Sequence, residues 1–162
     1  HWRHMGRKNV DARLHEVAGP ALLKAMQAAK KDPAAELGIA EVVVTAGFGL
    51  SSQWVAHTVT PDFDLRPEAL AELSAQLSAC HFHCIQALCK LSVHHIAFPA
   101  LSCGVKNFNY EIAAPIAVDA VATAAADSAH DLAIDFVFRE PGGLGAWRRV
   151  LENRSDFFDV QL

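Results

Sequence analysis

The stretch that decides the fold is residues 95–109, which read HIAFPALSCGVKNFN. It opens with a short apolar run closed by Pro99, which is typical of a buried strand. A polar loop with a single glycine, Gly104, follows and leads into an alanine-rich helix predicted over residues 110–126. In open α/β sheets, ligands bind where a strand ends and a helix begins, because backbone amides there can hold an anion. The stretch predicts such a loop, but one glycine is a weak signal on its own, and an ordinary strand-to-helix turn is the alternative.

Outward from this stretch, the chain alternates helices and strands. Apolar residues three and four apart predict helices, and β-branched or alternating apolar runs predict strands. The predicted helices span residues 11–31, 66–92, 110–126 and 146–153, and the predicted strands span residues 40–46, 53–59, 95–98 and 132–138. We expect Pro20 to kink the first helix and Pro141-Gly142-Gly143 to form a turn. Long helices between strands imply crossovers, so the expected fold class is α/β, with three layers and a largely parallel sheet.

Composition and charge limit what the chain can be. Its 162 residues suit one domain, and no apolar run approaches the roughly 18 residues of a membrane helix. The formal charge of −4 argues against a general nucleic-acid binder, which needs a concentrated positive field. Four cysteines are too few for a disulfide scaffold, so we expect reduced thiols and an intracellular location, cytoplasmic or nuclear.

Several segments, in matching order and spacing, resemble the macro domain family, whose members bind ADP-ribose. The segments are VDxxLHxxAGPAL at 10–22, AExxVTAGFGL at 40–50, WVAHTV at 54–59, CxxxC at 80–84, and IAFPALSCGV at 96–105 with Phe108 beyond it. The resemblance implies a mixed sheet between helices, with a cleft for ADP-ribose. We therefore divide the chain into a tag or linker remnant (residues 1–8), a macro-like domain (residues 9–153) and a C-terminal tail (residues 154–162).

The resemblance also implies which residues serve the ligand. Asp11 matches the aspartate that orients a water molecule or the ribose in hydrolytic members. A carboxylate near a glycosidic carbon can activate water as a general base, or stabilise positive charge on the sugar. Amides around Gly104 would face the diphosphate, and Phe108 would pack near the distal ribose. The implied ligand-binding residues are Asn9, Val10, Ser102, Cys103, Gly104, Val105, Lys106, Asn107, Phe108, Phe138 and Arg139.

The chain also departs from the family pattern. Macro domains normally begin with strands that carry an acidic residue for adenine and an Asn-Ala-Ala-Asn segment for the distal ribose, and one of these strands is central in the sheet. Neither feature is in this chain. Asn107 stands where glycine is usual, Asn109 where proline is usual, and Arg139 where an aromatic often stacks on adenine.

Two functional hypotheses follow. The first is a macro-type domain that binds ADP-ribose, free or attached to protein, with hydrolysis of mono-ADP-ribosyl linkages through Asp11 as an open question. The second is a macro fold that has lost its ligand and serves as an interaction or structural subunit. In that case we expect a protein partner to complete the sheet, because the missing strand would leave edges unpaired.

No metal or cofactor is expected. Cys80, His83 and Cys84 invite a zinc interpretation, but only the two cysteines share a helix face, and a closed zinc site needs four converging ligands. Cys103 has no general base at a supporting spacing, so the sequence disfavours a nucleophilic role for it.

Overall fold

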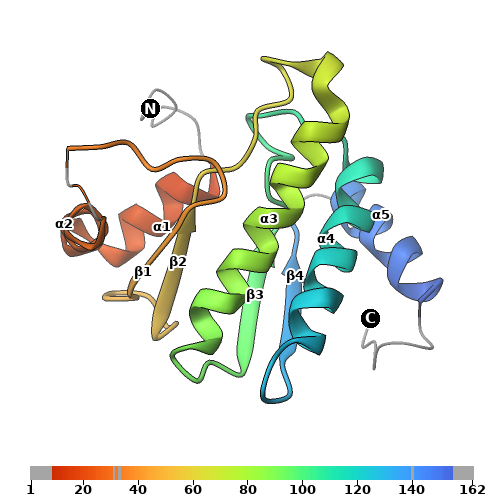
Figure 1. Ribbon diagram of the computed structural model, residues 1–162. Helices are drawn as coiled ribbons and strands as arrows, with labels where there is room; N and C mark the ends of the chain where they lie inside the picture. Colours follow the sequence, from red (N-terminus) through yellow and green to blue (C-terminus); the bar gives the residue numbers. More distant parts are fainter. Residues whose placement is uncertain (1–8, 31, 33, 140, 155–162) are drawn as a thin grey trace.

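In the computed structural model, the described residues are 9–30, 32, 34–139 and 141–154. The elements in chain order are α1 (Val10–Ala18), α2 (Pro20–Ala29), β1 (Val42–Ala46), β2 (Trp54–Thr58), the 3-10 helix η1 (Pro67–Ala69), α3 (Leu70–Cys89), β3 (His95–Pro99), α4 (Tyr110–Ala126), β4 (Ala133–Val137) and α5 (Pro141–Glu152) (Figure 1). This mixture confirms the predicted α/β class. Each predicted strand is present, with ends within two residues of those expected. None of these helices has the length and apolar character needed to cross a bilayer.

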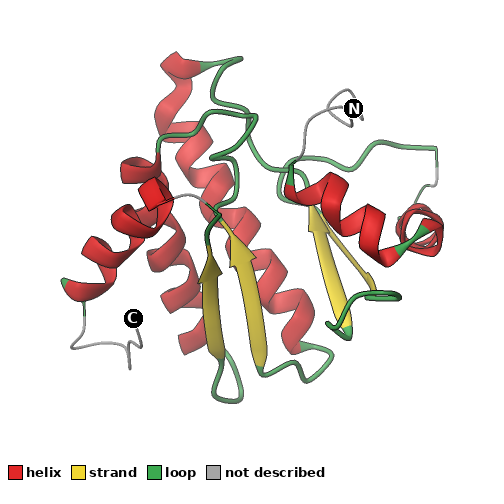
Figure 2. Cartoon of the chain, turned by 180° about the vertical axis from the view of Figure 1, so that it is seen from behind, coloured by secondary structure: helices red, strands yellow, loops and turns green. Residues whose placement is uncertain are grey.

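The strands form two separate two-stranded sheets where one largely parallel sheet was expected. β1 and β2 pair antiparallel, with Val44 opposite Ala56, whereas β3 and β4 pair in parallel, with Phe98 opposite Phe136. β2 and β3 are neighbours in space but are not hydrogen-bonded to each other (Figures 1 and 2). The described residues offer no further strand for the position between β2 and β3. The sheet is therefore split at that position.

Helices cover the two sheets unequally. α3 packs on β1 and β2, and its buried side chains also meet β3 and β4, while α4 lies against α3 and α5 against α4. On the opposite side, α2 packs on β1, and no described helix lies over the outer face of β3 and β4 (Figure 2). Ala97, Asp135 and Val137 on that face are exposed. The three-layer arrangement is thus present, with one outer layer covering only the β1–β2 pair.

The core lies between α3 and the two sheets. Cys84 and Ile85 of α3 meet Ile96 and Phe98 of β3, and partly buried side chains of β1 and β2 join the same cluster. A second cluster around Trp147 unites α3, α4 and α5. α3 therefore holds the two sheets in one body although they share no backbone hydrogen bond.

One polar side chain sits inside this core. His81 on α3 is 1% exposed, and its ring centroid lies 5.2 Å from that of Phe98. Burial lowers the pKa of His81 to about 4, so its imidazole is neutral at pH 7. Nδ1 lies 2.9 Å from the Leu77 carbonyl oxygen, but Nε2 has no hydrogen-bond partner among the described residues. The core thus contains an orphaned polar atom next to β3.

Two helices differ from their predicted form. The predicted helix over residues 11–31 is two helices, because the chain turns at Gly19, whose φ of 81° is left-handed. Pro141, Gly142 and Gly143 begin α5 and do not form the expected turn. Proline suits the first turn of a helix, where its missing N–H would have no partner in any case.

Candidate ligand-binding site

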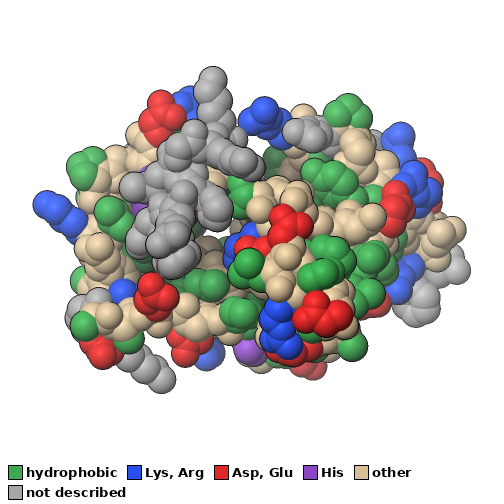
Figure 3. All heavy atoms as spheres, turned by 90° about the horizontal axis from the view of Figure 1, so that it is seen from above, with side chains coloured by type: hydrophobic (Ala, Val, Ile, Leu, Met, Phe, Trp, Pro, Cys, Tyr) green, Lys and Arg blue, Asp and Glu red, His purple; other side chains and the backbone are tan. Residues whose placement is uncertain are grey.

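The carboxyl ends of β2, β3 and β4 and the amino ends of α1 and α4 lie at one edge of the molecule (Figures 1 and 2). Helix amino ends carry unpaired amides and a partial positive charge, which suits an anion. Figure 3 looks down on this edge, and where the face is visible its acidic and basic side chains are interspersed. An anion bound here would therefore be held by local amides, not by a broad positive field.

The β3–α4 loop (residues 100–109) contains two left-handed residues. Ser102 has φ of 63° and Asn107 has φ of 52°, angles that a residue with a Cβ rarely adopts. Asparagine tolerates them better than most residues, which explains how Asn107 can stand where the family usually has glycine. The loop also closes on itself, because the Asn107 N–H donates to the Gly104 oxygen and the Phe108 N–H to the Ser102 oxygen, each at 3.1 Å. These bonds give the loop a defined shape.

Three consecutive amides of this loop remain without an acceptor among the described residues, those of Gly104, Val105 and Lys106. A Cβ placed on Gly104 would meet no heavy atom within 4 Å, so the space beside the backbone there is open. Successive free N–H groups in a tight loop form a concavity that binds phosphate oxygens. The geometry of the loop is therefore able to hold a diphosphate.

The Lys106 side chain is engaged within the protein. Its ammonium group donates to the Thr60 carbonyl oxygen, just beyond β2. Burial lowers the pKa of Lys106, and the charge of Asp62 opposes that shift. Lys106 thus ties the loop after β2 to the β3–α4 loop, and its backbone amide is the part left available to a ligand.

At the amino end of α1, the Asn9 side chain is bonded to the helix, whereas the Asp11 side chain is exposed to solvent. The Asn9 side chain caps the helix, because its Oδ1 accepts a hydrogen bond from the Ala12 N–H at 2.8 Å. Val10 is 52% exposed, and the Asp11 side chain is 60% exposed. Asp11 Oδ1 lies 3.7 Å from His15 Nε2 on the next turn. Asp11 is therefore accessible and has an imidazole beside it.

A row of polar side chains continues inward from Asp11. The His15 ring lies 6.4 Å from that of His57 on β2, and His57 Nε2 is 3.0 Å from the buried Thr45 hydroxyl. Burial lowers the pKa of His57, as does the nearby charge of His15, while Asp11 opposes the shift. His15 and His57 are not among the ligand-binding or catalytic residues predicted from the sequence. The available signal was the spacing of four residues from Asp11 to His15, which places both on one helix face.

The aromatic residues predicted near the ligand lie mostly inside the domain. Phe108 is 2% exposed and packs against Phe63, with ring centroids 5.5 Å apart. Phe138 is half-buried, with its ring centroid 5.0 Å from Trp147, and Arg139 beside it is exposed. Their contacts with a ribose or an adenine stay predictions.

All four cysteines are free thiols, and Cys80, Cys84 and Cys103 are buried. Burial raises the pKa of Cys103 to about 12, and burial together with Cys80 raises that of Cys84 to about 12. Thiols of such high pKa carry almost no nucleophilic thiolate at pH 7. In the described part of the chain, no group of three histidine, cysteine, aspartate or glutamate side chains is placed to hold a metal.

The segment after β2 contributes to this edge, although none of its residues is among the ligand-binding residues predicted from the sequence. The Pro61 carbonyl oxygen accepts from the Ser102 hydroxyl at 2.8 Å, and the Asp64 carboxylate accepts from Asn107 Nδ2 at 2.6 Å. These pairs are 41 and 43 residues apart in sequence. The sequence predicts a turn at Pro61. It does not predict the hydrogen bonds from this segment to the β3–α4 loop, because no sequence pattern links residues so far apart.

The fold and this edge define an α/β domain in which three backbone amides with no partner in the described structure lie between the end of a strand and the start of a helix. The model of the Macro domain family matches residues 3–117, so the chain belongs to the macro domain family. A macro domain-containing protein of Xanthomonas axonopodis pv. citri is 33% identical over 115 residues, which cover 70% of this chain and 63% of the relative. The chain thus spans less than two thirds of that relative's length.

Solved structures agree with this assignment. The Oceanobacillus iheyensis macrodomain with ADP is 26% identical, with a TM-score of 0.80, and the match covers 94% of this chain and 79% of that one. A mutant of the same macrodomain with ADPR is also 26% identical, with a TM-score of 0.79, covering 93% of this chain and 80% of that one. The expected macro-like fold is therefore confirmed.

Proposed function

We propose that the chain binds ADP-ribose, free or attached to protein. The observation that carries the proposal is the run of three free amides at residues 104–106, with open space at Gly104. A diphosphate presents several charged oxygens, and charge-assisted bonds from backbone N–H groups are the strong ones. The related Oceanobacillus iheyensis macrodomain, solved with ADP and with ADPR, supports the same ligand class.

We further propose that the site hydrolyses mono-ADP-ribosyl linkages, with Asp11 as the general base. An exposed carboxylate at the amino end of α1 is free to accept a proton from a water molecule that attacks the anomeric carbon. As the new bond to oxygen forms, the bond from that carbon to the modified side chain breaks, and the side chain leaves with the bonding electron pair. His15, 3.7 Å away, supplies a neighbouring group that can hold the carboxylate in position. An intracellular location for this activity stays a prediction.

Calorimetric titration tests the binding proposal. ADP-ribose and ADP are both expected to bind saturably at one site, and adenosine not measurably, because the proposed contacts are to the diphosphate. Absence of heat with ADP-ribose at millimolar concentration would refute the proposal. Equal binding of adenosine would show that the β3–α4 loop does not carry the affinity.

The split sheet favours a second candidate, an interaction subunit in which a protein partner adds a strand between β2 and β3. Within the described residues, the facing edges of these strands have no strand partner, and isolated two-stranded sheets are only marginally stable in water. In the described part of the chain, Thr58 Oγ1 on β2 and His81 Nε2 on α3 are also buried without a hydrogen-bond partner. Buried polar atoms normally have a hydrogen-bond partner. A further strand beside these atoms would supply one.

Deuterium exchange on the purified chain tests the open edges. The amides of β2 that point away from β1 are expected to exchange at least about tenfold faster than those bonded to β1, because an unpaired amide needs no opening. The alternation along Trp54–Thr58 provides the internal control. Uniformly slow exchange along β2 would show that the edge is already paired and would remove the basis of the second candidate.

A further inference from the structure

The segment of residues 60–64, here called the supporting loop, is bonded to both left-handed residues of the β3–α4 loop. The Ser102 hydroxyl donates to the Pro61 carbonyl oxygen at 2.8 Å, and Asn107 Nδ2 donates to the Asp64 carboxylate at 2.6 Å. Ser102 and Asn107 are the residues of the β3–α4 loop with positive φ. Each disfavoured backbone conformation is therefore tied by its own side chain to the same neighbouring segment.

Further contacts fix the two loops to each other. The Phe63 N–H donates to the Lys106 carbonyl oxygen at 3.1 Å, and the Lys106 ammonium group donates to the Thr60 carbonyl oxygen. The Phe63 and Phe108 rings pack together as well. Among the side chains of the supporting loop, Asp64 is the one that is exposed and hydrogen-bonded to the β3–α4 loop. A substitution at Asp64 can therefore test the connection without opening the core.

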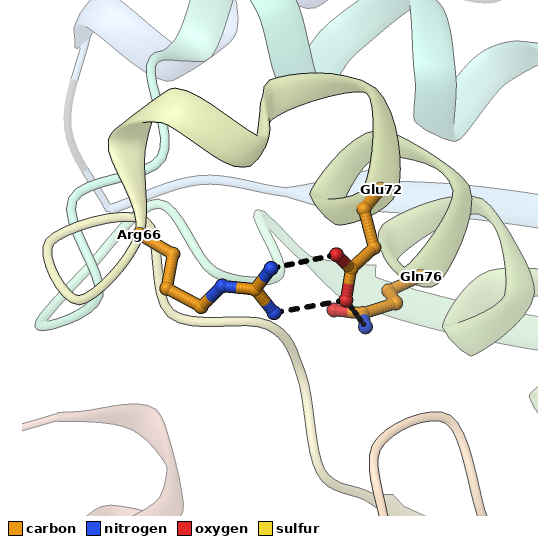
Figure 4. A network of polar contacts seen from close by, with 3 residues as sticks. All are labelled: Arg66, Glu72 and Gln76. Carbon is orange, nitrogen blue, oxygen red and sulfur yellow. Dashed lines mark hydrogen bonds and ion pairs between the residues drawn. The ribbon is translucent and has the colours of Figure 1, made fainter.

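The supporting loop is itself anchored on α3. Arg66 forms a bidentate pair with Glu72, with N–O distances of 3.0 and 2.8 Å, and Glu72 also accepts from Gln76 at 3.1 Å (Figure 4). The Arg66 N–H donates to the Phe63 carbonyl oxygen at 3.3 Å. Bidentate guanidinium–carboxylate pairs fix orientation as well as distance. The supporting loop is thus held by the helix that packs on both sheets.

We propose that Asp64 is a positioning residue for ADP-ribose binding, an inference that rests on the proposed function. Its carboxylate holds Asn107 in the left-handed conformation, and that conformation sets the direction of the free amides at residues 104–106. Without the carboxylate, Asn107 relaxes toward the right-handed region that residues with a Cβ prefer. The three amides then no longer converge on one anion. Asp64 acts through Asn107 and makes no contact with the ligand.

Titration of ADP-ribose into three variants tests this role. Asp64→Ala is expected to weaken binding about three- to tenfold, the net value of one ordinary hydrogen bond, because the bond that is lost is exposed to solvent. Asp64→Asn keeps an acceptor oxygen for Nδ2 and should bind within about twofold of wild type. Asp135→Ala is the matched control, because Asp135 is an exposed aspartate that pairs with His95 at 2.7 Å on the outer sheet face. It should bind as wild type.

Asn107→Gly removes the side chain that bonds Asp64 but keeps the backbone conformation, because glycine adopts positive φ without a supporting hydrogen bond. In that background, adding Asp64→Ala should change the affinity by less than about 1.5-fold, since the two residues act through one bond. Deuterium exchange of the Asn107 and Phe108 amides, which donate to the Gly104 and Ser102 oxygens, should rise in Asp64→Ala relative to α4 and return to the wild-type rate in Asp64→Asn. If Asp64 only stabilised the domain, Asp64→Ala would raise exchange in α4 as well.

Wild-type affinity of Asp64→Ala would overturn the proposal. So would an equal loss in the Asn107→Gly background, because Asp64 would then act on the ligand directly. A wild-type chain that binds no ADP-ribose refutes the proposed function instead. In that case the exchange rates of the Asn107 and Phe108 amides alone decide whether Asp64 positions the loop.

Discussion

Gly104→Val is expected to abolish measurable ADP-ribose binding and to leave the melting temperature unchanged. Gly104 does not have positive φ, and a Cβ there would meet no heavy atom within 4 Å, so the fold accepts the larger residue. The valine side chain instead fills the space beside the three free amides. Losing two charge-assisted bonds to a diphosphate costs about 3–6 kcal/mol, which weakens binding at least about 100-fold.

Gly145→Val provides the matched control for this experiment. Gly145 lies in α5, and the nearest atom to its added Cβ is a terminal nitrogen of Arg149 at 3.5 Å, an ordinary contact at a flexible end. This variant should bind ADP-ribose as wild type in the same titration. Retained affinity in Gly104→Val, with an unchanged melting curve, would place the ligand elsewhere and would remove the β3–α4 loop from the proposed site.

The local signals of the sequence were sufficient for most elements of the fold. Apolar runs bounded by glycine or proline located the four strands, because a strand needs only a few β-branched or aromatic residues and a stop. The loop after Pro99 was also predictable, since a strand that ends before a helix must turn there. The start of α5 was missed because Pro141 was interpreted as a breaker, whereas proline equally begins helices.

Features set by distant parts of the chain were not predictable from local patterns. The sequence gives no measure of whether neighbouring strands pair, so the separation of β2 from β3 emerged only from the structure, although the absence of a central strand had signalled an incomplete sheet. The bond from Asn107 to Asp64 joins residues 43 positions apart, and no periodicity links them. Within the candidate site, the amides at residues 104–106 could be anticipated from a strand–loop–helix pattern. The elements that hold those amides in place could not.

Asp11→Ala is expected to slow the release of ADP-ribose from a mono-ADP-ribosylated protein about 10²–10⁴-fold, the usual contribution of a general base. ADP-ribose affinity should change far less, because the amides at residues 104–106 carry the proposed diphosphate contacts. Asp11→Asn should be as slow as Asp11→Ala, since an amide fills the same space but cannot take a proton from water. The measurement is the rate of ADP-ribose release at saturating enzyme, with the titration repeated on each variant.

Glu16→Gln separates the chemistry of Asp11 from the effect of removing an acidic side chain from α1. Glu16 is exposed on the same helix and pairs with Arg13 at 2.6 Å, so its replacement removes one negative charge and one surface ion pair at little cost in stability. It should release ADP-ribose at the wild-type rate. If Asp11→Ala and Glu16→Gln both match wild type, Asp11 is not the base. If only Asp11→Ala and Asp11→Asn are slow while both bind ADP-ribose, the carboxylate acts in the chemical step, because binding has been measured separately in the same variants.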